Sequence, residues 1–272
     1  MITIIFGECG AGKTALMTHL LNQSNFDLKR YNNMCNSLQD IADTYKLDII
    51  NIPNTHVMSN YNINFFKFGY NRNKNLYVNP FRIGFKNKFV DVQRIPPFAF
   101  IGIDEAQEFF NSRLSKYYPS WQSRFYEKHR HFDLDFILVA QRADLIDVNI
   151  RDLSHFIDIE ELRIINDNNG TPKKLVWKVR KINSVRKYNR YINSDCTDKT
   201  CYKTEKIIAD YNVFACYDSK AEKTRFIETY IGKETYFEDY SSSIEDLDEL
   251  IKYLEKYNSL MPKDFYQKGS TL

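Results

Sequence analysis

The sequence contains no apolar run that is long enough to cross a membrane. Its longest apolar runs, residues 98–103 and 136–140, are far shorter than the roughly 20 residues that a membrane-spanning helix needs. We expect no secretory leader either, because a strand-like run begins at Ile2. These absences predict a protein that stays in the cytoplasm of its cell.

Cysteine is scarce, and its spacing is not that of a known site. The chain has five cysteines, an odd number, and no two of them show C-x-x-C spacing. This argues against a zinc site and against a framework of disulfides. We expect reduced thiols, as in a cytosolic protein.

A strong excess of one charge is missing from the chain as a whole, but not from its parts. The formal net charge is +3, yet residues 168–194 contain cations and no acid, whereas residues 234–257 are mainly acidic. The chain has 272 residues, of which 43% are hydrophobic and 27% charged. This composition is ordinary for a folded soluble protein with one substantial core and a small appendage.

A phosphate-binding signature is present near the start. Residues 7–14 read G-x-x-x-x-G-K-T and stand between a β-type run, residues 2–6, and a helix-compatible stretch, residues 15–21. Glycines let backbone N–H groups turn toward phosphates, Lys13 would reach the β- and γ-phosphates, and Thr14 would hold Mg²⁺. A chance glycine-rich turn is the alternative, but the flanking elements also fit a P-loop. The residues expected to bind ATP are Gly7, Glu8, Cys9, Gly10, Ala11, Gly12, Lys13, Thr14 and Ala15.

An acidic pair follows a second apolar run. Asp104 and Glu105 come directly after residues 98–103, whose continuous apolar character is typical of a parallel strand buried on both faces. If this strand neighbours the P-loop strand, its carboxyl end brings both acids to the nucleotide. We expect Asp104 to hold the water shell of Mg²⁺ and Glu105 to orient the attacking water. The alternative is a helix start, which favours acids anyway.

Gln141 ends the next apolar strand, residues 134–140, at the same predicted edge of the sheet. Its amide would hydrogen-bond the water or the γ-phosphate, unless it is an ordinary polar residue at a strand end. Phosphoryl transfer also calls for an arginine. Arg130 precedes this strand, so it would lie far from its own nucleotide and act on a neighbour's in a ring. Arg142 and Arg151 remain rivals for that role.

The order of elements predicts an α/β fold with a mainly parallel sheet and right-handed crossovers. Strands at 2–6, 47–52, 98–103, 134–140 and 155–159 belong to an expected ATPase core, residues 1–160. Within it, residues 54–97 would form an inserted β-hairpin or small meander, as a local core or a contact surface. Residues 161–232 would form a basic β-rich extension, and residues 233–272 an amphipathic helix and a tail.

Residues 160–192 have the pattern of a basic β-hairpin with its turn at 166–170. Trp177, Tyr188 and Tyr191 stand among its cations, which favours a surface that tracks nucleic-acid phosphates with interleaved aromatics. The alternative is a solvated edge whose lysines prevent aggregation. The cations are Lys173, Lys174, Lys178, Arg180, Lys181, Arg186, Lys187 and Arg190.

With these residues placed, the chain resembles the zonular occludens toxin-like (Zot) ATPases, which are phage assembly proteins within the FtsK–HerA superfamily of DNA-pumping motors. The P-loop, residues 103–106 and above all residues 129–141 carry the resemblance, with further similarity at 145–147, 150–153 and 214–219. The block 129–141 is the most specific part, because the P-loop alone occurs in many families.

The resemblance implies a RecA-like core and Mg²⁺-ATP hydrolysis between the subunits of a ring, expected to be a pentamer or hexamer. It also implies Gln141 as strand-end sensor and Arg130 as the arginine that acts in trans. Membrane-bound members carry a transmembrane helix beyond the ATPase domain, and this chain ends without one. Either the chain is the part before such a helix, at the cytoplasmic face of a membrane, or it belongs to a soluble branch in the host cytoplasm.

Three functions remain open at this point. A viral DNA-translocating ATPase that packages the genome or drives virion assembly agrees best with the motifs, and a capsid portal or membrane assembly protein would be its partner. A nucleotide-switched assembly scaffold would use the same P-loop without moving DNA. A small-molecule kinase needs an acceptor pocket and a lid, for which the hairpin and the insert offer no obvious counterpart.

Overall fold

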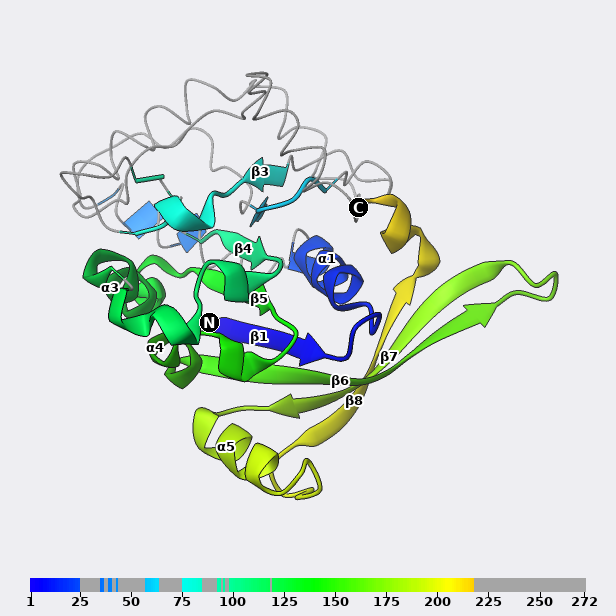
Figure 1. Cartoon of the computed structure of the whole chain (residues 1–272). Helices are drawn as coiled ribbons and strands as arrows, with labels where there is room; N and C mark the ends of the chain where they lie inside the picture. The colour runs from blue at the N-terminus through cyan, green and yellow to red at the C-terminus, as the bar shows by residue number, and fades with distance from the viewer. Residues whose placement is uncertain are drawn as a thin grey trace, which may run out of the picture.

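The computed structural model of this chain describes residues 1–24, 35–36, 39–40, 43, 57–63, 75–84, 92–93, 95, 98–117 and 119–217. In these residues the strands form one sheet in the spatial order β3-β2-β4-β5-β1-β6-β7-β8 (Figure 1). The strands are β1 (Ile2–Gly7), β2 (Val57–Ser59), β3 (Asn75–Tyr77), β4 (Phe100–Ile103), β5 (Asp135–Val139), β6 (Ser154–Asn166), β7 (Pro172–Ile182) and β8 (Lys203–Asp210). The α-helices labelled in Figure 1 are α1 (Lys13–Ser24), α3 (Ser120–Glu127), α4 (Val148–Asp152) and α5 (Val185–Asn193).

Most of the sheet is parallel. The strands from β3 to β6 in the spatial order pair in parallel, whereas β7 and β8 are added to β6 in antiparallel fashion. The central strands β1, β4 and β5 are mainly apolar and buried, as is typical of parallel strands that are covered on both faces. The expected α/β fold with a mainly parallel sheet flanked by helices is therefore confirmed.

The core lies in two layers, one on each face of the sheet. Successive residues of a strand point to opposite faces. Ile4 and Leu138 accordingly lie in one layer, and Ile5 and Val139 lie in the other. Helix α1 covers the second layer, whereas α3, α4 and α5 close the first. These helices contribute the buried residues Leu16, Phe125, Tyr126, Ile150, Tyr188 and Tyr191.

Helix α1 approaches the sheet closely at Gly102 of β4. A side chain at this position would place its Cβ 2.6 Å from Leu21 Cδ1 and 3.1 Å from Met17 Sδ, both of which belong to α1. The missing side chain thus lets the helix lie directly against the strand. Because α1 begins straight after the P-loop, this packing fixes the path by which the loop enters the helix.

The segment 54–97 does not form the expected hairpin where it is described. Strand β2 pairs in parallel with both β3 and β4, so β2 and β3 extend the main sheet instead of turning back on one another. Val57 and Val78 are fully buried, which favours the core reading of this segment over an exposed contact surface. Residues 64–70, the expected strand at 47–52 and the expected tail helix lie outside the described residues.

The hairpin expected after residue 160 is present, but it ends earlier than predicted. Strands β6 and β7 pair antiparallel around a turn at residues 167–171. Strand β7 stops at Ile182, and helix α5 takes the place of the rest of the expected arm. Strand β8 pairs with β7 and lies within residues 161–232, the expected β-rich extension, in which no bounds for this strand were predicted.

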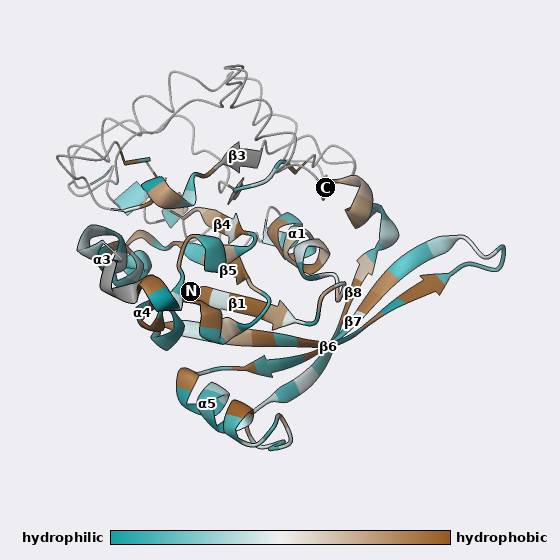
Figure 2. Cartoon of the chain, in the orientation of Figure 1, coloured by the Kyte–Doolittle hydropathy of each residue, from teal (hydrophilic) through white to brown (hydrophobic). Residues whose placement is uncertain are grey.

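We call the strands β6, β7 and β8 the arm, because their outer part projects from the sheet. Gly7 at the end of β1 pairs with Ile159, and β6 then continues to Asn166. Figure 1 shows the arm extending past the body of the molecule, and Figure 2 shows both apolar and polar residues along it. Strand β6 runs through residue 160, so the expected border between core and extension falls inside one strand, and the division into domains stays a prediction.

Within the described part of the chain, no helix combines the length and the apolar character that a membrane crossing requires.

Candidate nucleotide-binding site

Residues 8–12 form the loop between β1, which ends at Gly7, and α1, which begins with Lys13 and Thr14 (Figure 1). Gly10 and Gly12 have backbone φ angles of +81° and +73°, a left-handed region that glycine adopts without strain. At Gly12 a side chain would also collide, since its Cβ would lie 2.8 Å from Leu162 Cδ2 and 3.1 Å from Trp177 Nε1. Glycine therefore serves both the turn of the loop and its close approach to the arm.

Lys13, the first residue of α1, folds back over the loop. Its Nζ donates hydrogen bonds to the backbone oxygens of Gly7 at 3.0 Å and of Glu8 at 2.8 Å. In the part of the chain that the structure describes, this ammonium group forms no ion pair with a carboxylate. Its positive charge is thus held by neutral groups and remains available to an anion.

Two segments that are far apart in the sequence meet at Thr14. Its Oγ1 donates a hydrogen bond to Asp104 Oδ2 at 2.7 Å. Asp104 comes directly after β4, as expected, but β4 does not neighbour β1, because β5 lies between them. The prediction of adjoining strands was therefore wrong. The contact still forms because α1 packs across both β4 and β5 and carries Thr14 to the acid.

Glu105 has an unusual backbone conformation. Its φ and ψ are +48° and +43°, in the left-handed helical region, which costs a residue with a side chain about 1 kcal/mol or more. Its N–H donates to Asp104 Oδ1 at 3.1 Å, and Gln107 Nε2 donates to its carboxylate. These contacts hold both acids at the carboxyl edge of the sheet. Gln107 was missed by sequence reasoning, because a glutamine two residues from an acid is no recognisable signal.

The turn after β2 adds further residues that sequence reasoning missed. Asn60 forms two hydrogen bonds with the backbone of Asp104. Tyr61 shares a hydrogen bond of 2.9 Å with Thr18 of α1 and packs edge-on against Tyr217. Burial and the nearby Asp104 carboxylate raise the pKa of Tyr217 to about 12, and burial is the main cause that raises the pKa of Tyr61. Both phenols are therefore neutral near pH 7 and add no charge beside the acid.

Gln141 lies at the same edge of the sheet, two residues after the last residue of β5, Val139. Because β5 separates β1 from β4, this position is between the P-loop and Asp104. The side chain of Gln141 is exposed. Its neighbour Arg142 forms an ion pair of 2.7 Å with Asp144.

Arg130 and Arg151 lie at the opposite edge of the sheet. Arg130 is exposed in the 3₁₀ helix His129–Phe132, which leads into the amino end of β5. Arg151 belongs to α4, which comes just before the amino end of β6. Neither arginine is therefore close to the P-loop of its own chain. Of the three arginines considered in the sequence, Arg142 is the one at the P-loop edge.

The aromatic residues of the basic segment belong to the core. Trp177 and Tyr191 are fully buried, and Tyr188 is 4% exposed. Trp177 lies beneath the P-loop at Gly12 and stacks on His19 of α1, with ring centroids 6.3 Å apart. The expectation that these three rings interleave with cations on an exposed surface was wrong. These rings instead pack in the core, where Trp177 lies against the P-loop and Tyr188 and Tyr191 lie against the sheet.

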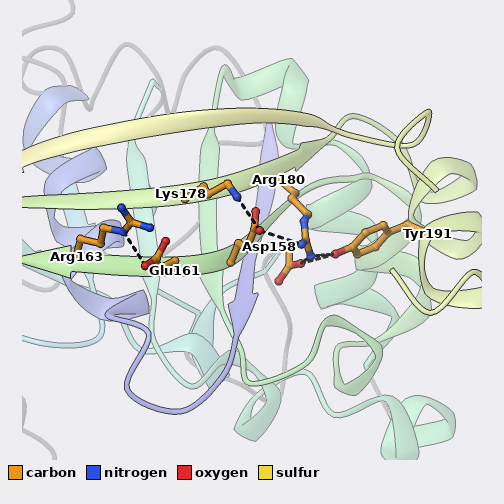
Figure 3. A network of polar contacts seen from close by, with 7 residues as sticks. Asp158, Glu161, Arg163, Lys178, Arg180 and Tyr191 are labelled. Atoms are coloured by element: carbon orange, nitrogen blue, oxygen red, sulfur yellow. Dashed lines mark hydrogen bonds and ion pairs between the residues drawn. The ribbon is translucent and has the colours of Figure 1, made fainter. Parts of the chain in front are cut away.

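Several cations of the same segment are already paired with carboxylates (Figure 3). The ion pairs are Lys178–Glu160 at 2.8 Å, Arg180–Asp158 and Arg180–Glu160 at 3.3 Å, and Lys181–Glu205 at 2.7 Å. Tyr191 Oη donates to Asp158 and accepts from Arg180 at 2.8 Å. The hydrogen bond from Lys178 lowers the pKa of Glu160, so this carboxylate remains ionised at neutral pH.

The other cations of the segment lie in two separate places. Lys173 and Lys174 are near the turn of the arm, whereas Arg186, Lys187 and Arg190 are on α5, which follows the opposite end of β7. All five are exposed, and none of them forms an ion pair with a described residue. The expected continuous basic hairpin is thus divided by the paired charges in its middle.

The residues of the site fit a Mg²⁺ ion that arrives with a nucleotide. Thr14 and Asp104 offer a hydroxyl and a carboxylate oxygen, which are the hard ligands that Mg²⁺ prefers. The described residues contain no group of three or more His, Cys, Asp or Glu side chains that could hold a metal. One carboxylate beside one hydroxyl suits Mg²⁺, which usually takes one or two carboxylates and fills its other positions with water and phosphate oxygens.

A glycine-rich loop between a strand and a helix, and an acid after a second parallel strand, define the class of this protein as an α/β fold of the P-loop NTPase type. Comparison with known proteins then gives the family. The model of the family "Zonular occludens toxin (Zot)" matches residues 1–223. The chain belongs to the Zot family, as its motifs suggested. A search of curated protein sequences found no match.

The chain also matches solved structures of proteins from a bacterium and from a virus. The N-terminal domain of zonular occludens toxin from Neisseria meningitidis has 15% sequence identity and a TM-score of 0.43, covering 80% of this chain and 98% of that chain. The genome packaging NTPase B204 from Sulfolobus turreted icosahedral virus 2, in complex with ATP-gammaS, has 15% identity and a TM-score of 0.35, covering 78% and 92%. The same NTPase in complex with AMPPCP gives a TM-score of 0.36, with the same identity and coverage.

Proposed function

We propose that this chain is a Mg²⁺-dependent ATPase that binds ATP in the loop of residues 7–15. One observation carries the proposal, the hydrogen bond of 2.7 Å between Thr14 Oγ1 and Asp104 Oδ2, which joins the P-loop to the acid after β4. A hydroxyl and a carboxylate in direct contact are both available to one Mg²⁺ ion. When bound, this ion neutralises charge on the β- and γ-phosphates.

The P-loop supplies the positive charge that a triphosphate needs. Lys13 would exchange its hydrogen bonds with Gly7 and Glu8 for phosphate oxygens, which are stronger acceptors because they are charged. The first N–H groups of α1 have no partner inside the helix, and they lie at the positive end of its dipole. Binding would therefore be driven by electrostatic attraction and by backbone hydrogen bonds.

Glu105 is the residue that we propose to orient the attacking water. Its carboxylate accepts a hydrogen bond from Gln107, and its backbone is tied to Asp104, so its position is fixed relative to the metal ligand. Gln141 lies between the P-loop and Asp104 and is proposed as the sensor. An amide both donates and accepts hydrogen bonds, so it can contact the water and a γ-phosphate oxygen together.

We further propose that the active form is a homo-oligomeric ring in which Arg130 acts on the ATP of a neighbouring subunit. The exposure of Arg130 and its position at the edge opposite to the P-loop support this role, because the residue is remote from its own nucleotide. A guanidinium supplied in trans stabilises the charge on the transferring phosphoryl group. Arg142 is the alternative at the P-loop edge, if its ion pair with Asp144 opens.

The finer part of the proposal is that ATP hydrolysis moves viral DNA during genome packaging or virion assembly in the host cytoplasm, with a capsid portal or membrane assembly protein as partner. Membership of the Zot family and the exposed cations at both ends of β7 support it. Lys173 and Lys174 of the arm, together with the cations of α5, would contact phosphates.

A second candidate function is a nucleotide-switched assembly scaffold that does not move DNA. The pairing of Lys178, Arg180 and Lys181 with carboxylates favours it, because these cations are less available to phosphates. The burial of Trp177 favours it as well, since a buried ring cannot stack on a base.

ATP turnover measured against protein concentration, with and without duplex DNA, tests the proposal. We expect a steep rise of turnover per subunit with concentration, because hydrolysis is completed between subunits, and a further rise with DNA. Turnover that DNA leaves unchanged would support the scaffold. Absence of any ATP turnover at all concentrations would contradict the ATPase itself.

A DNA-binding assay at several salt concentrations, on a variant with neutral residues at Lys173, Lys174, Arg186, Lys187 and Arg190, tests the DNA surface. DNA affinity should fall, and its salt dependence should become flatter by about 0.9 in the log–log slope for each lost phosphate contact. Unchanged affinity and slope would remove these five residues from the proposed surface.

A further inference from the structure

The side chain of Asn60 continues the sheet by one residue at the position of Asp104. Strands β2 and β4 pair in parallel up to Ser59 and Gly102, where the ladder ends. Beyond it, the Asp104 N–H donates to Asn60 Oδ1 at 2.8 Å, and Asn60 Nδ2 donates to the Asp104 backbone oxygen at 3.0 Å. An amide group offers one acceptor and two donors, so it can satisfy both backbone groups of a strand residue at once.

The burial of Asn60 makes this pair of contacts specific. Asn60 is 4% exposed, so water has little access to replace the lost hydrogen bonds. Its own N–H also donates to the Gly102 oxygen at 3.3 Å, which ties the backbone of the turn to β4. The backbone of Asn60 is therefore attached to β4, and this attachment keeps its side-chain amide beside Asp104.

Fixing the backbone of Asp104 also fixes the direction of its carboxylate. The two backbone groups of Asp104 are satisfied by Asn60, and its carboxylate oxygens accept from Thr14 Oγ1 and from the Glu105 N–H. The Asp104 oxygen that Asn60 holds belongs to the peptide unit that enters Glu105, whose backbone is left-handed. Asn60 thus restrains the backbone of Asp104 and the peptide unit that joins Asp104 to Glu105.

We propose that Asn60 is a positioning residue for the Mg²⁺ site, acting through Asp104 without touching the ion. This inference rests on the proposed function, because it concerns the same site. Partners that orient a metal ligand from outside the first coordination shell commonly change metal affinity or activity by about 10- to 100-fold when they are removed. We expect Asn60→Ala to fall in that range.

The test compares Asn60→Ala with Gln122→Ala. Gln122 of α3 is also a buried amide, 5% exposed, and donates to the backbone oxygens of Pro80 at 3.1 Å and Phe81 at 3.2 Å. Both variants therefore lose a buried amide with two hydrogen bonds to backbone, but only Asn60 contacts Asp104. Any general loss of stability should appear in both.

The readout is the affinity for a fluorescent, non-hydrolysable ATP analogue, measured with Mg²⁺ and again with EDTA. In the Asn60→Ala variant, the factor by which Mg²⁺ tightens binding should fall about tenfold, whereas affinity in EDTA should remain unchanged. The Mg²⁺ concentration for half-maximal ATP hydrolysis should rise to a similar extent. Gln122→Ala should match the wild type in all three quantities.

A milder variant covers the case in which Asn60→Ala does not fold. Asn60→Ser keeps a hydroxyl that can replace one of the two hydrogen bonds, so its Mg²⁺ effect should lie between those of the wild type and Asn60→Ala. If folded Asn60 variants show the full Mg²⁺ effect of the wild type, or if Gln122→Ala loses as much, the positioning role is overturned while the ATPase proposal stands. If the wild type binds no nucleotide, both proposals fail.

Discussion

Lys13, the cation of the P-loop, and the cations in the middle of the arm have partners of different charge. In the arm, Lys178 and Arg180 contact the carboxylates of Glu160 and Asp158, and their charges are balanced within the fold (Figure 3). At the P-loop, Lys13 is held by neutral backbone oxygens. A paired cation must give up a carboxylate before it binds a phosphate, whereas Lys13 gives up only weaker acceptors.

This difference shows why a basic segment is not by itself a binding surface. The segment from Lys173 to Arg190 has no acid in its own sequence, but β6 brings Asp158 and Glu160 opposite it. The register between β6 and β7 therefore decides which cations are available. At the P-loop, the local turn holds Lys13 through backbone oxygens. Among the described residues, no carboxylate from a strand is paired with this lysine.

The largest expected effect is that of Glu105→Gln on turnover. The substitution keeps the size of the side chain and removes the negative charge that orients water, so ATP turnover should fall about 100- to 10,000-fold while ATP still binds. Turnover assays and nucleotide binding measured on the same preparation check this. Glu160→Gln, which removes an acid of the arm network, is the matched control and should keep normal turnover. Normal turnover in Glu105→Gln would remove this residue from its role.

Arg180→Met should produce a smaller effect, on stability. The Arg180 side chain is 22% exposed, and its guanidinium joins Asp158, Glu160 and Tyr191. Its loss leaves the partly buried Asp158 carboxylate, which keeps its hydrogen bond from Tyr191, without the cation that balances its charge. We expect the free energy of unfolding to fall by about 1 to 3 kcal/mol, measured by urea denaturation. A variant as stable as the wild type would show that the arm network is not structural.

Acidification should have the smallest effect. Burial is the main cause that lowers the pKa of His19, His129 and His155 below the ordinary value of 6.5. The unfolded chain then binds protons more readily than the folded one as the pH falls through 6.5, so stability present above 6.5 is lost progressively below it. Thermal unfolding at pH 7.5 and 5.5 should show a lower Tm at pH 5.5, with a smaller difference in His19→Gln. An unchanged or higher Tm at pH 5.5 would contradict these shifts.

The P-loop, Asp104 and Glu105 could be predicted because each follows a recognisable apolar strand within a short stretch of sequence. The order of the strands could not, since β5 lies between β1 and β4 only through pairing across the whole sheet. The contact between Asn60 and Asp104 could not be predicted for the same reason, since it forms only because β2 pairs with β4.

Helix α5 was missed although a signal was present. Ser184 accepts from the Lys187 N–H at 3.4 Å as an N-cap, and Tyr188 and Tyr191 stand three residues apart on the buried side of the helix. The alternation of apolar and basic residues in β7 had favoured a continued strand. A capping serine followed by apolar residues at helical spacing was the better guide at this point.

Calorimetric titration of Mg²⁺-ATP into the wild type, Lys13→Met and Lys203→Met tests the central claim most directly. Lys203 of the arm is paired with Glu205 at 3.0 Å, so its loss should leave ATP affinity unchanged. Lys13→Met should bind ATP at least about 100-fold more weakly, because charge-assisted hydrogen bonds to the phosphates are lost. If Lys13→Met binds ATP as tightly as the wild type, the loop of residues 7–15 is not the nucleotide site.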